Sequence, residues 1–164
     1  MIWRGLIGAT LAIVIAAAAG PAAAQGKKSG LPIPRFVSLG SSEVNVRTGP
    51  GKRYPVSWMF VRRGLPVMVV DEFDHWRRIV DSDGAVGWVH KALLSGRRTA
   101  LVSGATRPLF REPNPASSAL LLAEENVQGR LLRCEPNWCE VEIADRRGWM
   151  QREHLFGVLK DEVF

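Results

Sequence analysis

The chain has 164 residues and carries 22 Lys and Arg against 16 Asp and Glu, a formal net charge of +6. A modest positive charge attracts anionic surfaces but does not identify a partner. Two cysteines and three scattered histidines, without an adjacent histidine pair, make a poor zinc site, so no metal and no other cofactor is expected.

The N-terminus has the three parts of a secretory signal peptide. Met1–Arg4 carries a positive charge, Leu6–Ala19 is an unbroken apolar run, and Pro21–Ala24 supplies an Ala-x-Ala cleavage site. The alternative is a retained membrane anchor, but the apolar run is shorter than the roughly 20 residues needed to span a bilayer. We therefore expect cleavage after Ala24 and a periplasmic protein that does not span the membrane.

Export also bears on the partner. Removing residues 1–24 leaves 21 basic and 16 acidic residues, a charge of about +5. Nucleic acid is not expected as the partner, because it lies on the other side of the membrane. Residues 25–39, rich in Gly, Lys and Pro at their start, are predicted to be a linker.

An internal repeat follows the linker. Trp76 and the pair Gly87-Trp88 recur as Trp138 and Gly148-Trp149, at a separation of about 61 or 62 residues. The repeat predicts two copies of one small domain, at residues 40–102 and 103–164. Each copy is near the lower size limit for a single folded core.

Within each copy the pattern is that of short strands. In the first, Val44 and Val46 alternate with polar residues, Val67–Val70 is a β-branched run, and Asp81–Gly84 is a hairpin signal. In the second, Ala144–Arg147 occupies the hairpin position. Only His90–Leu94 could form a helical turn. The sequence therefore predicts an all-β fold of two small barrels in tandem.

Both cysteines lie in the exported part of the second copy. An even number of cysteines in an oxidising compartment predicts one disulfide, Cys134 to Cys139.

The first copy resembles the bacterial Src-homology-3-like domain family. The resemblance rests on Val44–Gly51, with its Asn-Val-Arg and Gly-Pro-Gly elements, then Tyr54-Pro55-Val56, Arg63–Val67, Trp76 and Gly87-Trp88-Val89. The second copy keeps Trp138 and Gly148-Trp149 but lacks the Gly-Pro-Gly turn, so it is a divergent copy. The resemblance implies Src-homology-3-like barrels and a binding role.

The residues expected to contact a ligand all lie in the first copy. They are Trp76, whose ring offers a large contact area, Tyr54 and Trp58 beside the expected groove, and Arg62 among the basic residues. For each of them a purely structural role is the alternative.

No nucleophile with an adjacent base and no phosphate-binding glycine loop appears in the sequence, so we do not expect an enzyme. The predicted function is non-catalytic recognition of an envelope protein or peptide. The alternative is a module that binds peptidoglycan, and no single residue separates the two.

Overall fold

The computed structural model describes residues 24–25 and 29–164. The predicted signal peptide, residues 1–24, lies outside the described residues apart from Ala24, so export stays a prediction. No helix in the described ranges combines the length and the apolar character that crossing a membrane requires. A short pair of strands, β1 (Ala24–Gln25) and β2 (Pro32–Ile33), precedes the first barrel.

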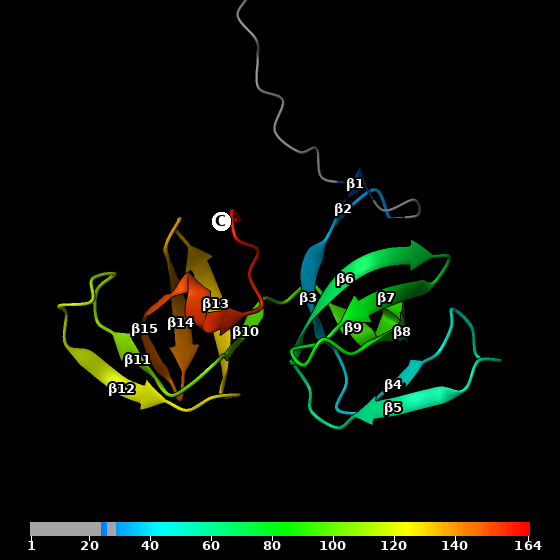
Figure 1. Cartoon of the computed structure of the whole chain (residues 1–164), viewed down its shortest axis with the longest axis horizontal. Coiled ribbons are helices and arrows are strands. Elements are labelled where there is room, and N and C mark those ends of the chain that lie inside the picture. Colours follow the sequence, from blue (N-terminus) through cyan, green and yellow to red (C-terminus); the bar gives the residue numbers. More distant parts are fainter. Residues whose placement is uncertain (1–23, 26–28) are drawn as a thin grey trace, which may run out of the picture.

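The first barrel is a curled antiparallel sheet with the strand order β5-β4-β8-β7-β6-β3-β9 (Figure 1). A 3-10 turn, η1 (Lys91–Leu93), connects β8 to β9, where the helical turn was predicted. The strands are β3 (Arg35–Leu39), β4 (Val44–Arg47), β5 (Val56–Phe60), β6 (Pro66–Phe73), β7 (Trp76–Val80), β8 (Val86–His90) and β9 (Leu94–Ser95).

The second barrel repeats this topology, with the order β12-β11-β15-β14-β13-β10-β16 and a matching 3-10 turn, η2 (Arg152–His154). Each strand has its counterpart at the same place in the first sheet, which confirms the predicted tandem of two small all-β barrels. The strands are β10 (Thr99–Val102), β11 (Arg107–Phe110), β12 (Ala119–Ala123), β13 (Gln128–Cys134), β14 (Trp138–Ile143), β15 (Arg146–Gln151) and β16 (Leu155–Phe156).

Strand alternation builds the two cores. On β4, Val44 and Val46 are fully buried while Asn45 between them is exposed, because successive side chains point to opposite faces of the sheet. Val67 and Val69 on β6 contribute to the same core. The core of the second barrel comprises Ala100, Val102, Leu109, Ala123, Leu131, Cys134, Cys139, Val141, Ile143, Met150, Leu155 and Val158.

Both predicted hairpins form. Between β7 and β8, the Asp81 Oδ1 atom accepts hydrogen bonds from the backbone N–H groups of Asp83 (3.0 Å) and Ala85 (2.8 Å). Between β14 and β15, Ala144 and Asp145 have φ angles of 48° and 60°, the left-handed conformations that a tight two-residue hairpin requires.

The structure divides the chain at different points from the sequence-based boundaries. Strand β3 lies inside the predicted linker, residues 25–39, because Phe36 and Leu39 are buried and β3 pairs with β6. Residues 99–102, which the sequence-based boundaries assign to the first barrel, form β10, and this strand pairs with β13 of the second barrel. The connection between the barrels is therefore Gly96–Arg98, and Ser103–Thr106 is a turn within the second barrel.

The two barrels lie side by side and share contacts (Figure 1). Phe36 meets Phe156 edge to face, with ring centroids 5.1 Å apart. The Thr99 hydroxyl donates a hydrogen bond to the Gly64 carbonyl oxygen at 2.6 Å. These contacts hold one barrel against the other beyond the short connection in sequence.

Candidate functional site

Of the four predicted ligand residues, Trp76 lines a cavity in the described part of the chain. It begins β7 directly after a tight turn, in which Asp74 has a φ of 49°. The residue is only 9% exposed, and its ring meets the His90 ring edge to face, with centroids 5.4 Å apart. The cavity, of about 290 Å³, is lined by Asn45, Arg47, Lys52, Trp76, His90 and Leu93.

The other three predicted ligand residues lie elsewhere. Tyr54 packs its ring against Gly49, in the loop after β4. Trp58 packs against the first core from β5. Arg62 reaches the second barrel, where its Nη1 atom donates to the Asn126 carbonyl oxygen at 3.4 Å. Tyr54 and Trp58 therefore have packing contacts, and Arg62 has a contact between the barrels. All three lie outside the Trp76 cavity.

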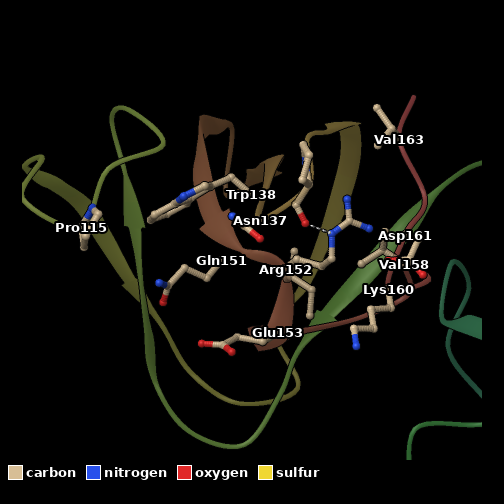
Figure 2. Close-up of a pocket in the computed structure, with 12 residues that line it drawn as sticks. Pro115, Asn137, Trp138, Gln151, Arg152, Glu153, Val158, Lys160, Asp161 and Val163 are labelled. Atoms are coloured by element: carbon tan, nitrogen blue, oxygen red, sulfur yellow. Dashed lines mark hydrogen bonds between the residues drawn. The ribbon is translucent and has the colours of Figure 1, made fainter.

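A larger cavity, of about 980 Å³, occupies the equivalent place on the second barrel (Figure 2). Trp138 begins β14 as Trp76 begins β7, and it pairs across the sheet with Gln151 as Trp76 pairs with His90. Trp138 is more exposed than Trp76, so its ring is accessible to a ligand. We call this cavity the Trp138 groove; its lining is Pro115, Pro136, Asn137, Trp138, Gln151, Arg152, Glu153, Leu155, Val158, Lys160, Asp161 and Val163.

The buried Arg152 guanidinium ties together two walls of the Trp138 groove. Its Nε atom donates to the Pro136 carbonyl oxygen at 2.9 Å, and its terminal nitrogens donate to the carbonyl oxygens of Glu135, Leu159 and Glu162. These acceptors belong to the β13–β14 loop and to the C-terminal segment, residues 157–164. Arg152 therefore fixes the distance between the two segments and has a structural role in the groove.

The C-terminal segment is held in place from outside as well. Phe164 exchanges two backbone hydrogen bonds with Cys134, at 3.0 and 3.4 Å. Arg98 forms an ion pair with Glu162 and lies 4.8 Å from the centroid of the Phe164 ring. Burial alone would raise the pKa of Glu162, but hydrogen bonds from Arg98 and the Leu159 amide hold it below its usual value. The C-terminal segment, which forms the outer wall of the groove, is therefore fixed by its contacts with Cys134 and Arg98.

The predicted disulfide is confirmed between Cys134 and Cys139, which lie opposite each other on β13 and β14. It closes the loop that carries Pro136, Asn137 and Trp138 into the groove. The first barrel has no such bridge at the matching Phe73–Trp76 turn, which is shorter.

We expect reduction, or the double substitution Cys134→Ser and Cys139→Ser, to lower the free energy of unfolding by about 2 kcal/mol. The reason is that a bridge closing so short a loop restricts the unfolded chain. Thermal melts with and without reductant measure this effect. The double variant should be insensitive to reductant, and equal melting temperatures of the oxidised and reduced wild-type protein would contradict the prediction.

Sequence reasoning placed the ligand site on the first copy and missed the Trp138 groove. The signal that could have located it is the repeat itself, because Trp138 occupies the position of Trp76. Within the described ranges, no group of three or more His, Cys, Asp or Glu residues is arranged to hold a metal ion. What the groove offers a ligand is an aromatic face, two prolines and the side-chain amides of Asn137 and Gln151.

Comparison with known families gives two matches. The family model described as bacterial SH3 domain matches residues 40–96 and, a second time, residues 103–157. The two matches together cover more than half of the chain, one in each barrel. A search of curated proteins found no match.

Similar solved structures include NlpC2 and NlpC1 from Trichomonas vaginalis, each 12% identical with a TM-score of 0.34. The alignments cover 75% and 80% of this chain and 48% of either solved chain. A NlpC/P60 family protein from Bacillus cereus ATCC 10987 is 15% identical, with a TM-score of 0.34, 74% of this chain covered and 55% of that chain. The chain thus spans about half the length of these structures, and similarity at this level carries no conclusion about function.

Proposed function

Since the chain belongs to the bacterial SH3 domain family, with one domain in each barrel, we propose that it is a non-catalytic, periplasmic binding protein. Its ligand is an extended peptide segment of an envelope protein, and the Trp138 groove receives it. The export signal expected at residues 1–24 supports the compartment.

The observation that carries the proposal is the lining of the Trp138 groove. Pro115, Pro136 and the ring of Trp138 provide apolar surface for ligand side chains. Asn137 and Gln151 provide amide groups that both donate and accept hydrogen bonds, as the backbone of an extended peptide requires. Apolar walls with a few polar groups are typical of ligand-binding pockets.

Arg152 and the two cysteines, which could carry chemistry at or beside this groove, have structural partners. The guanidinium of Arg152 donates to four backbone carbonyl oxygens. The two cysteines of the hairpin are joined to each other and are not available as thiol nucleophiles. These pairings support a role in recognition.

Photo-crosslinking in intact cells tests the proposal. A photoreactive amino acid replaces Lys160, which is exposed at the rim of the groove, and a second version replaces Arg130, which is exposed and does not line it. We expect discrete protein adducts from position 160 and not from position 130. A smear that collapses on muramidase digestion would instead support the alternative ligand, peptidoglycan.

Trp138→Ala is expected to lower the yield of these adducts at least about tenfold, because a buried aromatic contact dominates small interfaces. The matched control is Phe73→Ala, which removes an exposed aromatic side chain from the equivalent hairpin of the first barrel. It should leave the yield unchanged. Unchanged crosslinking in a folded Trp138→Ala variant would refute the proposed site.

A further inference from the structure

The Trp76 cavity of the first barrel differs from the Trp138 groove in its charge. Arg47, Lys52 and His90 make up half of the residues that line it, together with Asn45, Trp76 and Leu93, and this lining includes no Asp or Glu. The Trp138 groove, by contrast, is lined by Arg152 and Lys160 together with Glu153 and Asp161. The two cavities therefore favour ligands of different charge.

The guanidinium of Arg47 is fixed in place before any ligand binds. Its Nη1 atom donates to the backbone carbonyl oxygens of Tyr54 (2.7 Å) and Lys52 (3.2 Å). These bonds fasten the loop that follows β4 over the cavity and leave the Nε and Nη2 donors of Arg47 for another acceptor, since no bond to them occurs within the described residues. Pre-organised donors lower the cost of binding an anion, because little side-chain freedom is lost.

Six other arginines of this protein differ from Arg47 in having a carboxylate partner. Arg35 and Arg77 pair with Glu72, and Arg98 pairs with Glu162. Arg130, Arg133 and Arg147 pair with Glu142 or Glu140. Within residues 24–25 and 29–164, Arg47 has no carboxylate partner, although it lines a cavity large enough for one.

The net charge of the first barrel also favours an anionic ligand. Residues 35–98 carry 11 Lys and Arg against 6 Asp and Glu, a net charge of +5. Residues 99–164 carry 8 against 10, a net charge of −2. By net charge, the first barrel attracts an anion more strongly than the second does.

From these observations we propose that the Trp76 cavity is a carboxylate-binding site for a peptide. Arg47 and Lys52 pair with the carboxylate, and Trp76 and Leu93 contact the apolar part of the residue that carries it. The carboxylate comes either from the C-terminus of the peptide or from an acidic side chain. The site goes beyond the proposed function, because it lies on the other barrel and does not need the Trp138 groove.

An NMR titration of the mature full-length protein tests this site, with the Trp76 indole and the Asn45 amide as reporters. Three probes are compared: N-acetyl-trialanine with a free C-terminal carboxylate, a C-terminally amidated peptide with a central glutamate, and amidated N-acetyl-trialanine, which is neutral. We expect saturable shifts from at least one carboxylate probe and at least about tenfold weaker binding of the neutral one. Which carboxylate probe binds more tightly identifies the source of the anion.

Lys52→Gln and Arg53→Gln form a matched pair, because they remove the same charge from adjacent exposed residues and only Lys52 lines the cavity. Lys52→Gln should weaken binding about three- to fivefold, and Arg53→Gln less than about twofold. Equal effects of the two, equal binding of the neutral probe, or no saturable shift at millimolar probe would each overturn the site. Trp138→Ala should not alter these shifts, so failure of the proposed groove is distinguished from failure of this site.

Discussion

Replacing Gly148 with alanine is expected to lower the free energy of unfolding by about 3 kcal/mol. A Cβ atom at this position would lie 2.6 Å from the Phe110 carbonyl oxygen and 2.8 Å from the Cγ atom of the fully buried Leu109. The nearest obstacle is backbone, and Phe110 pairs with Trp149 across β11 and β15, so the strand itself would have to move. Urea unfolding followed by tryptophan fluorescence measures the loss.

Gly96→Ala is the matched control, because a Cβ atom there meets no atom within 4 Å. Its free energy of unfolding should stay within about 0.5 kcal/mol of wild type. In the first barrel, Gly87→Ala should resemble Gly148→Ala, since the added atom would lie 2.3 Å from the Cγ1 atom of the buried Val46. A loss below about 1 kcal/mol at Gly148 would show that β11 shifts easily and would contradict the prediction.

The glycine–tryptophan repeat shows why the fold could be predicted from the sequence. In each barrel the glycine admits a neighbouring strand, and the following tryptophan is partly buried in the first barrel and buried in the second, so both copies need the same residues in the same places. The boundaries were less predictable. Strands β3 and β10 have little sequence in common, and β3 follows a Pro- and Gly-containing stretch that is typical of a linker.

The candidate site was predicted only in part, and the reason is spatial. Trp76 was predicted from the sequence, and it lines a cavity but is nearly buried. The larger groove around Trp138 depends on Pro115 and on the C-terminal segment, which are far from Trp138 in the sequence and meet it only in the folded chain. A motif in a single stretch of sequence cannot predict a groove whose walls come from distant segments.

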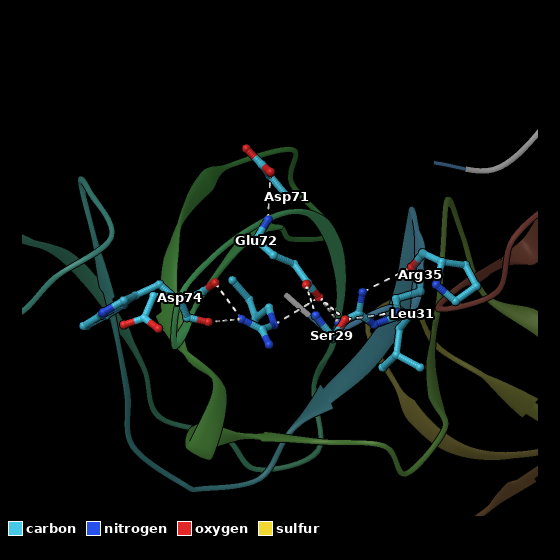
Figure 3. A network of polar contacts seen from close by, with 9 residues as sticks. Ser29, Leu31, Arg35, Asp71, Glu72 and Asp74 are labelled. Atoms are coloured by element: carbon cyan, nitrogen blue, oxygen red, sulfur yellow. Dashed lines mark hydrogen bonds and ion pairs between the residues drawn. The ribbon is translucent and has the colours of Figure 1, made fainter. Parts of the chain in front are cut away.

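A buried ion-pair network attaches the segment before β3 to the first barrel (Figure 3). The Glu72 carboxylate, whose side chain is fully buried, pairs with Arg35 at 2.7 Å and with Arg77 at 3.2 Å. It also accepts hydrogen bonds from the Ser29 hydroxyl (2.7 Å) and the Ser29 backbone N–H (2.9 Å). The Glu72 carboxylate therefore connects the segment at Ser29, strand β3 and strand β7.

Glu72→Gln is expected to lower the free energy of unfolding at neutral pH by about 3 kcal/mol, because it leaves two largely buried guanidinium groups without their anion. The matched control is Glu43→Gln, which removes a negative charge from an exposed residue of the same barrel. That variant should stay within about 0.5 kcal/mol of wild type. Urea unfolding of the three proteins at pH 7 measures the difference.

The same carboxylate predicts how stability depends on pH. Burial alone would raise the pKa of Glu72, but hydrogen bonds from Ser29 and Arg35 and the charge of Arg77 outweigh it and lower the pKa from 4.5 to about 2. Because the carboxylate is favoured in the folded state, its contribution is complete above pH 4.5 and is lost as the pH falls towards 2. The full shift corresponds to roughly 3 kcal/mol. The stability difference between wild type and Glu72→Gln should therefore shrink over this window, and a difference that stays constant from pH 5 to pH 2 would contradict the role assigned to Glu72.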